Sequence, residues 1–205
     1  MLTAVPALPG HYVDTNTPCS DALLRLVKAS GALGVTRYVG LPNNNPANDI
    51  SGAELLRIAA AGLACCLVQH VRGPEKGFTG WRPSRHSGAD DAAAAVAAAQ
   101  AAGYPAGAHL FLDLENIDDG AFATIQYAVA WQHVVIAAGY RAGLYVGFQV
   151  PLHPLDLYDL PGFDCYWSDA GHREVATRGC AVIQGAGIVV GGVPFVCAES
   201  MAAAA

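Results

Sequence analysis

Short apolar runs recur along the chain, separated by longer segments with the periodicity and caps of helices. The runs predict strands at residues 11–14, 35–39, 63–71, 109–116, 142–146, 163–167, 180–184 and 193–197. Helices are expected between the first five strands, at residues 22–29, 51–61, 90–102 and 118–138. Serine or aspartate residues at the start of each helix can serve as its N-cap, and a glycine follows the end of each helix. Ser51 and Glu54 have the spacing of a capping box.

The regular alternation of strand and helix predicts a parallel sheet. Eight strands in this order favour an α/β fold, a single (β/α)₈ TIM-type barrel whose second half has lost or shortened its helices. An open doubly wound sheet is the alternative. With 205 residues and no linker-like stretch, the chain suits one domain. We therefore expect a single barrel domain over residues 1–200 and a disordered tail at residues 201–205.

The strand at residues 109–116 is the most informative part of the sequence. It is apolar through Leu110, Phe111 and Leu112 and then places two carboxylates, Asp113 and Glu115, on the same face. Burying acids at the end of such a run costs free energy unless something uses them. Ligands bind at this end of the strands in α/β folds, and paired carboxylates are what glycoside hydrolysis requires. The simpler alternative is one helix cap and one ion pair.

Polar or aromatic residues also end almost every other predicted strand. In a barrel, these ends converge on one rim. Taken singly, Asp14 could cap a turn, His70 could be structural, and Arg37 could be a counter-ion for Asp14 or Asp113. Trp81 lies in a long polar loop after the third strand, where function is common. The candidates are Asp14, Arg37, Tyr38, Gln69, His70, Trp81, Asp113, Glu115, Tyr145, Trp167, Asp169 and Gln184.

Several motifs resemble a known family. They are Y-V-D-T-N-T-P, T-R-Y-V-G, S-G-A-E-L-L, A-A-G-Y-P-x-G, L-F-L-D-L-E, G-Y-R-A-G-L-Y-V-G and Y-W-S-D-A, in this order over residues 10–185. Together they resemble the glycoside-hydrolase-like domain typified by an exported mycobacterial protein. That domain is similar to the barrel lysozymes of glycoside hydrolase family 25. The chain departs from the pattern in its last strand, which lacks the usual aspartate.

The resemblance implies a lysozyme-like or endolysin-like glycosidase that acts on a glycan of N-acetylated sugars, with peptidoglycan the expected substrate. It makes Glu115 the general acid and gives Asp14, Asp113 and Asp169 stabilising roles. The expected substrate-binding residues are Arg37, Tyr38, Gln69, His70, Trp81, Tyr145, Trp167 and Gln184. A non-catalytic glycan-binding or structural module on the same barrel is the alternative. A different barrel hydrolase would need a closed pocket for a small substrate.

Composition and charge narrow the classes of function and of binding partner that remain possible. The net charge of −6 argues against a nucleic-acid-binding surface. The six cysteines lack C-x-x-C spacing and lie mostly in apolar runs, so they are expected to be buried thiols, and neither a metal nor another cofactor is expected. No transmembrane segment or signal peptide is predicted. We expect a monomer, phage-encoded or acting at the bacterial cell wall.

Overall fold

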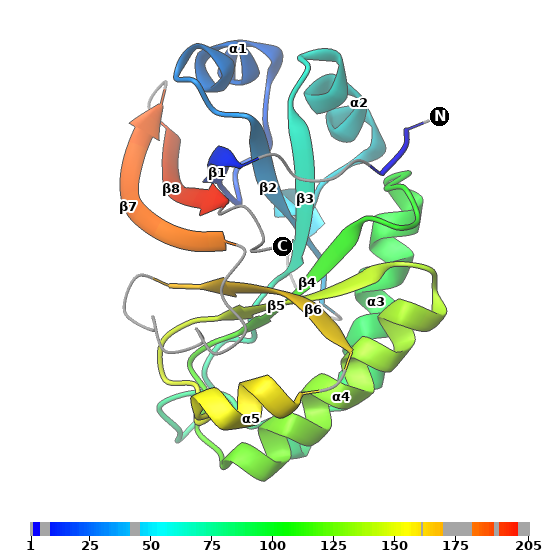
Figure 1. Ribbon diagram of the computed structural model, residues 1–205, viewed down its shortest axis with the longest axis vertical. Helices are drawn as coiled ribbons and strands as arrows, with labels where there is room; N and C mark the ends of the chain where they lie inside the picture. The colour runs from blue at the N-terminus through cyan, green and yellow to red at the C-terminus, as the bar shows by residue number, and fades with distance from the viewer. Residues whose placement is uncertain are drawn as a thin grey trace.

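The computed structural model describes residues 2–4, 9–41, 46–160, 162–169, 182–190 and 193–200 (Figure 1). The tail predicted at residues 201–205 lies outside these ranges. The strands are β1 (Gly10–Asp14), β2 (Gly34–Val39), β3 (Ala64–Gln69), β4 (His109–Leu114), β5 (Arg141–Val146), β6 (Phe163–Ser168), β7 (Val182–Val190) and β8 (Val193–Ser200). The helices are α1 (Asp21–Ala29), α2 (Gly52–Ala60), α3 (Gly88–Ala101), α4 (Ala121–Ala137) and α5 (Pro154–Asp159).

The strands pair in sequential order and close into a barrel. Strands β1 to β6 form a parallel sheet, and β7 continues it through a short pairing with β6. Strand β8 pairs antiparallel with both β7 and β1. The α/β class and the parallel sheet are therefore confirmed, and the order is not that of an open doubly wound sheet. A complete (β/α)₈ repeat is not seen, because the last strand returns directly from β7 as a hairpin.

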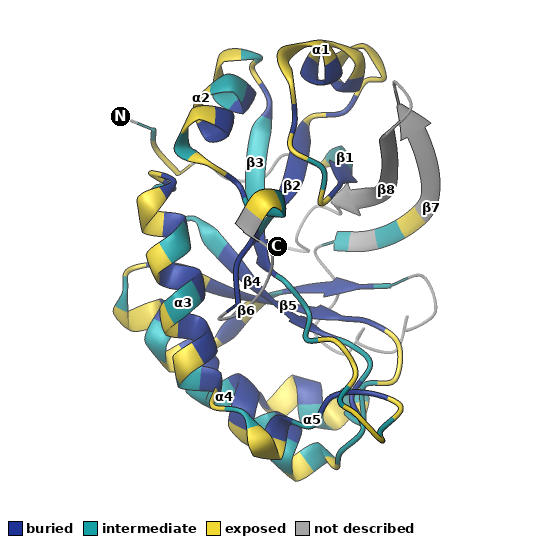
Figure 2. Ribbon diagram, turned by 180° about the vertical axis from the view of Figure 1, so that it is seen from behind, coloured by how far each residue is buried: buried dark blue, intermediate teal, exposed yellow. Residues whose placement is uncertain are grey.

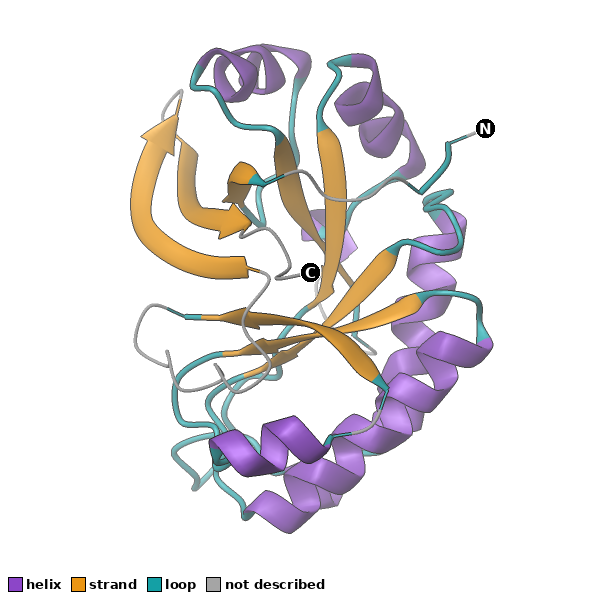
Figure 3. Ribbon diagram, viewed as in Figure 1, coloured by secondary structure: helices purple, strands orange, loops and turns teal. Residues whose placement is uncertain are grey.

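Side chains alternate between the barrel interior and the outer layer. In β4, Leu110, Leu112 and Leu114 point outward and join the large core beneath the helices. Phe111 points inward and packs with Val68, Tyr145 and Trp167 in a second, smaller cluster. The helices of the described residues lie outside the ring of strands (Figure 3) and bury their inner faces (Figure 2). This period of two decides which residue at each strand end can reach the interior.

Serine side chains cap the first three helices by accepting backbone N–H bonds in the first turn. Ser51 accepts from Glu54 N, as the capping-box spacing predicts, but the Glu54 side chain pairs with Arg37 instead of returning to the cap. Helix α3 is capped by Ser87, not by the predicted aspartates, because Asp91 is buried and paired with Arg72. No helix in the described ranges is long and apolar enough to cross a membrane.

The cysteines that the structure describes with their side chains are free thiols: Cys19, Cys65, Cys66 and Cys165. Cys19 is buried and the other three are half-buried, so the predicted burial is only partly met. Burial raises the pKa of the Cys19 thiol to about 11. The side chains of Cys180 and Cys197 lie outside the described part of the chain.

Candidate active site

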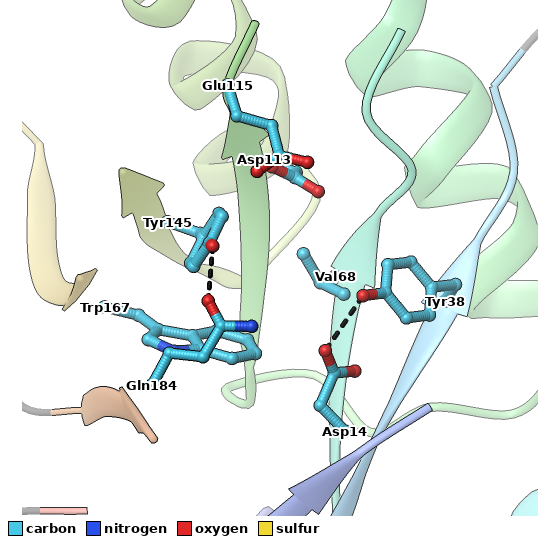
Figure 4. Close-up of a pocket in the computed structure, with 8 residues that line it drawn as sticks. All are labelled: Asp14, Tyr38, Val68, Asp113, Glu115, Tyr145, Trp167 and Gln184. Atoms are coloured by element: carbon cyan, nitrogen blue, oxygen red, sulfur yellow. Dashed lines mark hydrogen bonds between the residues drawn. The ribbon is translucent and has the colours of Figure 1, made fainter. Parts of the chain in front are cut away.

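A small pocket opens at the carboxyl ends of the barrel strands (Figure 4). Its empty volume, counted out to the solvent at its mouth, is about 340 Å³. Strands β1 to β6 contribute side chains at or next to their carboxyl ends, and β7 contributes one from near its start. The lining residues are Asp14, Tyr38, Val68, Asp113, Glu115, Tyr145, Trp167 and Gln184. All but Val68 belong to the set predicted from the sequence.

Aromatic rings form much of the pocket wall. The Tyr145 and Trp167 rings meet edge to face with centroids 5.0 Å apart, and Phe111 packs edge to face on Trp167 from below at 5.9 Å. The Tyr145 hydroxyl donates to Gln184 Oε1 at 2.5 Å, which fixes both side chains across the pocket (Figure 4). These contacts make the wall rigid before any ligand binds.

Arg37 does not reach the pocket. It follows Thr36 in β2 and points outward, where its wholly buried guanidinium donates to Glu54 Oε1 at 2.7 Å. It also donates to the backbone carbonyls of Thr15 and Asn48. Because successive strand residues face opposite sides, Tyr38 points inward and Arg37 cannot. Arg37 therefore ties β1, β2 and α2 together instead of contacting substrate.

Gln69 is also directed outward. Its Oε1 accepts from Trp131 Nε1 of α4 at 2.6 Å, and the side chain is buried. The inward position at this strand end is taken by Val68, which lines the pocket. The predicted substrate contact of Gln69 is thus replaced by a bond between β3 and α4.

Trp81 is too deeply buried to stack on a sugar, with 1% of its surface exposed. Its Nε1 donates to the Glu115 carbonyl at 2.8 Å, and its backbone pairs with Asn116 and Asp118 at 3.0 and 2.9 Å. Gly80 packs directly on the Asn116 carbonyl, where a Cβ would lie 2.1 Å from the oxygen. The loop at residues 79–81 therefore fixes the backbone that carries Glu115.

His70 and Asp169 lie next to the pocket without lining it. The His70 ring stacks on Tyr38 with centroids 4.6 Å apart, and its Nε2 lies 3.1 Å from Asp49 Oδ1. His70 thus supports a pocket wall from behind. Asp169 follows β6, and its charge acts on Glu115, as described below.

Asp113 is one of three carboxyl groups that line the pocket, with Asp14 and Glu115. It is buried, with 6% of its surface exposed. Its Oδ1 has no hydrogen-bond partner among the described residues. Burial, followed by the neighbouring Glu115 and Asp14 carboxylates, raises the pKa of Asp113 well above its ordinary value. Arg37, considered from the sequence as a counter-ion for Asp14 or Asp113, does not pair with Asp113, because it lies on the outer side of the sheet and pairs with Glu54.

Asp14 is equally buried but has a partner, since the Tyr38 hydroxyl donates to its Oδ2 at 2.9 Å (Figure 4). Burial raises the pKa of Asp14 to about 7, although the Tyr38 bond and the Arg37 charge oppose the shift. Asp14 therefore carries its proton through the acidic range and releases it near neutrality.

Glu115 is the half-buried member of the group and lines the pocket. Burial, and then the charge of Asp169, raises the pKa of Glu115. No basic side chain in the described ranges pairs with Glu115 or Asp113, so the simpler interpretation of these acids as an ion pair does not hold there. The three carboxyl groups instead share a site that favours retaining protons.

The raised pKa of Asp14 predicts that this site lowers stability at neutral pH. An unfolded aspartate ionises near pH 3.8, whereas folded Asp14 does so near pH 7. The free energy of unfolding should therefore fall as the pH rises through this interval and stay low above it. We expect Asp14→Asn to be more stable than the wild type at pH 8 by about 2–4 kcal/mol, and the difference to vanish near pH 4. Urea denaturation at both pH values tests this, and an equal difference at both would contradict it.

Two residues that shape the site are not signalled by charge or by aromatic character. Gly147 follows β5, and a Cβ there would lie 2.5 Å from Glu115 Oε2 and 2.7 Å from Glu115 Cβ. Asn116 adopts a left-handed backbone, with φ of 55°, directly after Glu115. The glycine in L-Y-V-G, just past a strand end, is the only sequence signal of this close approach.

The described residues offer no group of three His, Cys, Asp or Glu side chains arranged to hold a metal ion. Three buried polar atoms of the pocket residues do lack partners among the described residues: Asp14 Oδ1, Asp113 Oδ1 and Trp167 Nε1. Buried polar groups in folded proteins are usually hydrogen-bonded. The residues that line the pocket therefore contain two carboxyl oxygens and one indole N–H whose hydrogen bonds are not made within the described residues.

Solved structures with the same fold come from several sources. A B. stearothermophilus protein matches with a TM-score of 0.69 and 17% identity, over 93% of this chain and 95% of its own. The Mycobacterium tuberculosis Tat-secreted protein Rv2525c, in complex with L-tartrate, matches with a TM-score of 0.68 and 17% identity, over 95% of this chain and 97% of its own. The catalytic domain of endolysin ply40 from bacteriophage P40 of Listeria monocytogenes matches with a TM-score of 0.56 and 11% identity, over 97% of this chain and 96% of its own.

No curated protein matches the sequence. The profile of the Rv2525c-like, glycoside hydrolase-like domain matches residues 25–176, a span that includes Tyr38, Asp113, Glu115, Tyr145 and Trp167. The predicted family resemblance is thus confirmed over most of the chain. The protein belongs to the Rv2525c-like glycoside hydrolase-like domain family.

Proposed function

We propose that the protein is a glycoside hydrolase that cleaves a glycan of N-acetylated sugars, with peptidoglycan as the substrate. The observation that carries the proposal is the set of unpartnered buried polar atoms in an aromatic-walled pocket beside a half-buried acid. A sugar ring has an apolar face to stack on aromatic rings and hydroxyl and amide groups to pair with Asp14, Asp113 and Trp167. The structural similarity to an endolysin catalytic domain supports the same substrate class.

Glu115 is the general acid in this proposal. Its raised pKa keeps it protonated at a pH where an ordinary glutamate is ionised. It is also the carboxyl group among the three that is least buried, so it can reach a glycosidic oxygen at the pocket mouth. Trp81 bonds to the Glu115 carbonyl and Gly147 packs on the Glu115 side chain, which together hold the residue in place. Proton transfer to that oxygen allows the bond between the sugar C1 and the leaving group to break.

Asp113 and Asp14 face the positive charge that develops on the sugar, and each stabilises it once it has lost its own proton, which Asp14 does near pH 7. Both are buried beneath the reacting ring, and each keeps a carboxylate oxygen without a partner in the described residues. In an N-acetylated sugar the acetamido oxygen can attack C1, with Asp113 accepting a hydrogen bond from the acetamido N–H. Water then attacks C1, the acetamido oxygen leaves, and the ionised Glu115 takes up the proton of the water.

Incubation with purified, insoluble peptidoglycan and with chitin tests the proposal. We expect the turbidity of the peptidoglycan suspension to fall and new reducing ends to appear in proportion to enzyme. A pull-down with the same particles measures binding independently of cleavage. Binding without new reducing ends on either polymer would contradict the hydrolase and favour a glycan-binding module.

A further inference from the structure

Phe148 is a large aromatic side chain next to the acid pocket that neither the pocket nor the core accounts for. It follows Gly147, the residue packed on the Glu115 carboxylate, and 49% of its surface is exposed. The pocket rings Tyr145 and Trp167 are only 8% and 3% exposed. Those rings can contact only what enters the pocket, whereas Phe148 can contact a group outside it.

The backbone of Phe148 is bonded to the segment that carries the general acid. The Phe148 carbonyl accepts from Asn116 N at 2.8 Å, and the next carbonyl, that of Gln149, accepts from Ile117 N at 3.1 Å. Before it, Gly147 N donates to the Leu114 carbonyl at 2.8 Å. Residues 147–149 therefore run beside residues 114–117 as a fixed pair.

The bends in this pair involve unusual backbone conformations. Asn116 and Gln149 are the two non-glycine residues with positive φ, 55° and 54°, that the structure records in the described chain. Such conformations have an energetic cost for residues other than glycine and concentrate at functional sites. Asn116 directly follows Glu115, and Gln149 directly follows Phe148. The two bends fix the position of the Phe148 Cα relative to Glu115.

We propose that Phe148 is the stacking platform for the sugar that leaves, on the outer side of the bond that Glu115 protonates. In the proposed function one sugar lies in the pocket lined by Asp113 and Trp167, and Glu115 is the least buried acid of that lining. A ring carried on the segment beside Glu115 meets the next sugar along the glycan. This inference rests on the proposed function and adds to it a second binding position, which selects chains over single sugars.

Kinetics of Phe148→Ala on two substrates test the proposal. With an N-acetylglucosamine oligosaccharide, KM should rise roughly 5- to 15-fold, from the loss of about half a phenyl ring of contact. With a glycosyl fluoride of a single N-acetylated sugar, whose leaving group has no ring to stack, KM should stay within about twofold. Phe148→Tyr should restore the oligosaccharide KM, whereas Phe148→Leu should not, because a planar face is required.

Ile136→Ala is the matched control, because Ile136 is 46% exposed but lies in the last turn of α4. The binding of oligosaccharide to Glu115→Gln, with and without Phe148→Ala, repeats the comparison without turnover. Equal affinity in both would overturn the role of Phe148 and leave the proposed function standing. Neither binding nor cleavage by the wild type would overturn the proposed function, and this inference with it.

Discussion

Replacing Glu115 by glutamine is expected to lower the rate of glycan cleavage by roughly 10²–10⁴-fold while glycan binding is retained. This is the contribution that a positioned general acid makes to catalysis. Glutamine has the shape of glutamic acid, so the contact with Gly147 and the backbone clamp by Trp81 should persist. The measurement is kcat for the release of reducing ends from an oligosaccharide, together with Kd from titration.

Asp90→Asn is a suitable control for this variant. Asp90 lies in the first turn of α3 and is exposed, so the loss of its charge should leave kcat within about twofold. Circular dichroism and the denaturation midpoint establish that both variants are folded. Unchanged cleavage by Glu115→Gln would refute its role as the acid, and loss of binding with loss of activity would assign Glu115 to substrate binding.

Replacing Arg37 by methionine is expected to destabilise the fold by about 3–5 kcal/mol, because it leaves the buried Glu54 carboxylate without its charged partner. Both side chains of this ion pair are nearly inaccessible to solvent. The change also removes the bonds to the Thr15 and Asn48 carbonyls, and it removes the positive charge that lowers the pKa of Asp14. Urea denaturation at pH 7 measures the change in the free energy of unfolding.

The surface pair Arg141–Asp164 supplies the comparison. Its side chains are 54% and 45% exposed, and exposed pairs contribute about 0–1 kcal/mol. The double variant Arg37→Met with Glu54→Leu should recover part of the loss, since neither charge is then buried alone. A cost for Arg37→Met no greater than that for Arg141→Met would show that the buried pair does not hold β2 to α2.

The strand order and most of the pocket could be predicted from the sequence because each relies on a local pattern. The apolar run that ends in Asp113 and Glu115 locates a buried parallel strand and its carboxyl end. Tyr145 and Trp167 end later strands in the same way. In a barrel these ends meet, so the residues are brought together by topology without knowledge of the detailed packing.

The choice between neighbouring residues could not be made in this way. Arg37 and Tyr38 both end β2, and only the register of the strand decides that Tyr38 faces Asp14 while Arg37 faces α2. The same applies to Gln69 beside Val68. The strand parity set by Asp113 does not transfer to a neighbouring strand until the pairing is known, as in the register of Leu67 with Leu110.

Trp81 shows a second limit of the sequence. An aromatic residue in a polar loop after a strand is expected to be available to a ligand, yet this indole is buried and bonded to the Glu115 carbonyl. Long-range loop contacts of this kind leave no periodic signal. The sequence also gives no signal that β8 is antiparallel, because a short apolar strand has the same pattern of residues in either direction.

The dependence of the Glu115→Gln defect on the leaving group tests the central claim most directly. A sugar leaving group needs a proton, whereas a dinitrophenolate departs without one. Matched glycosides of the same N-acetylated sugar therefore separate proton donation from every other role of Glu115. We predict that Glu115→Gln loses roughly 10²–10⁴-fold in kcat/KM on the oligosaccharide and less than about tenfold on the dinitrophenyl glycoside. An equal loss on both substrates would contradict the assignment of Glu115 as the general acid.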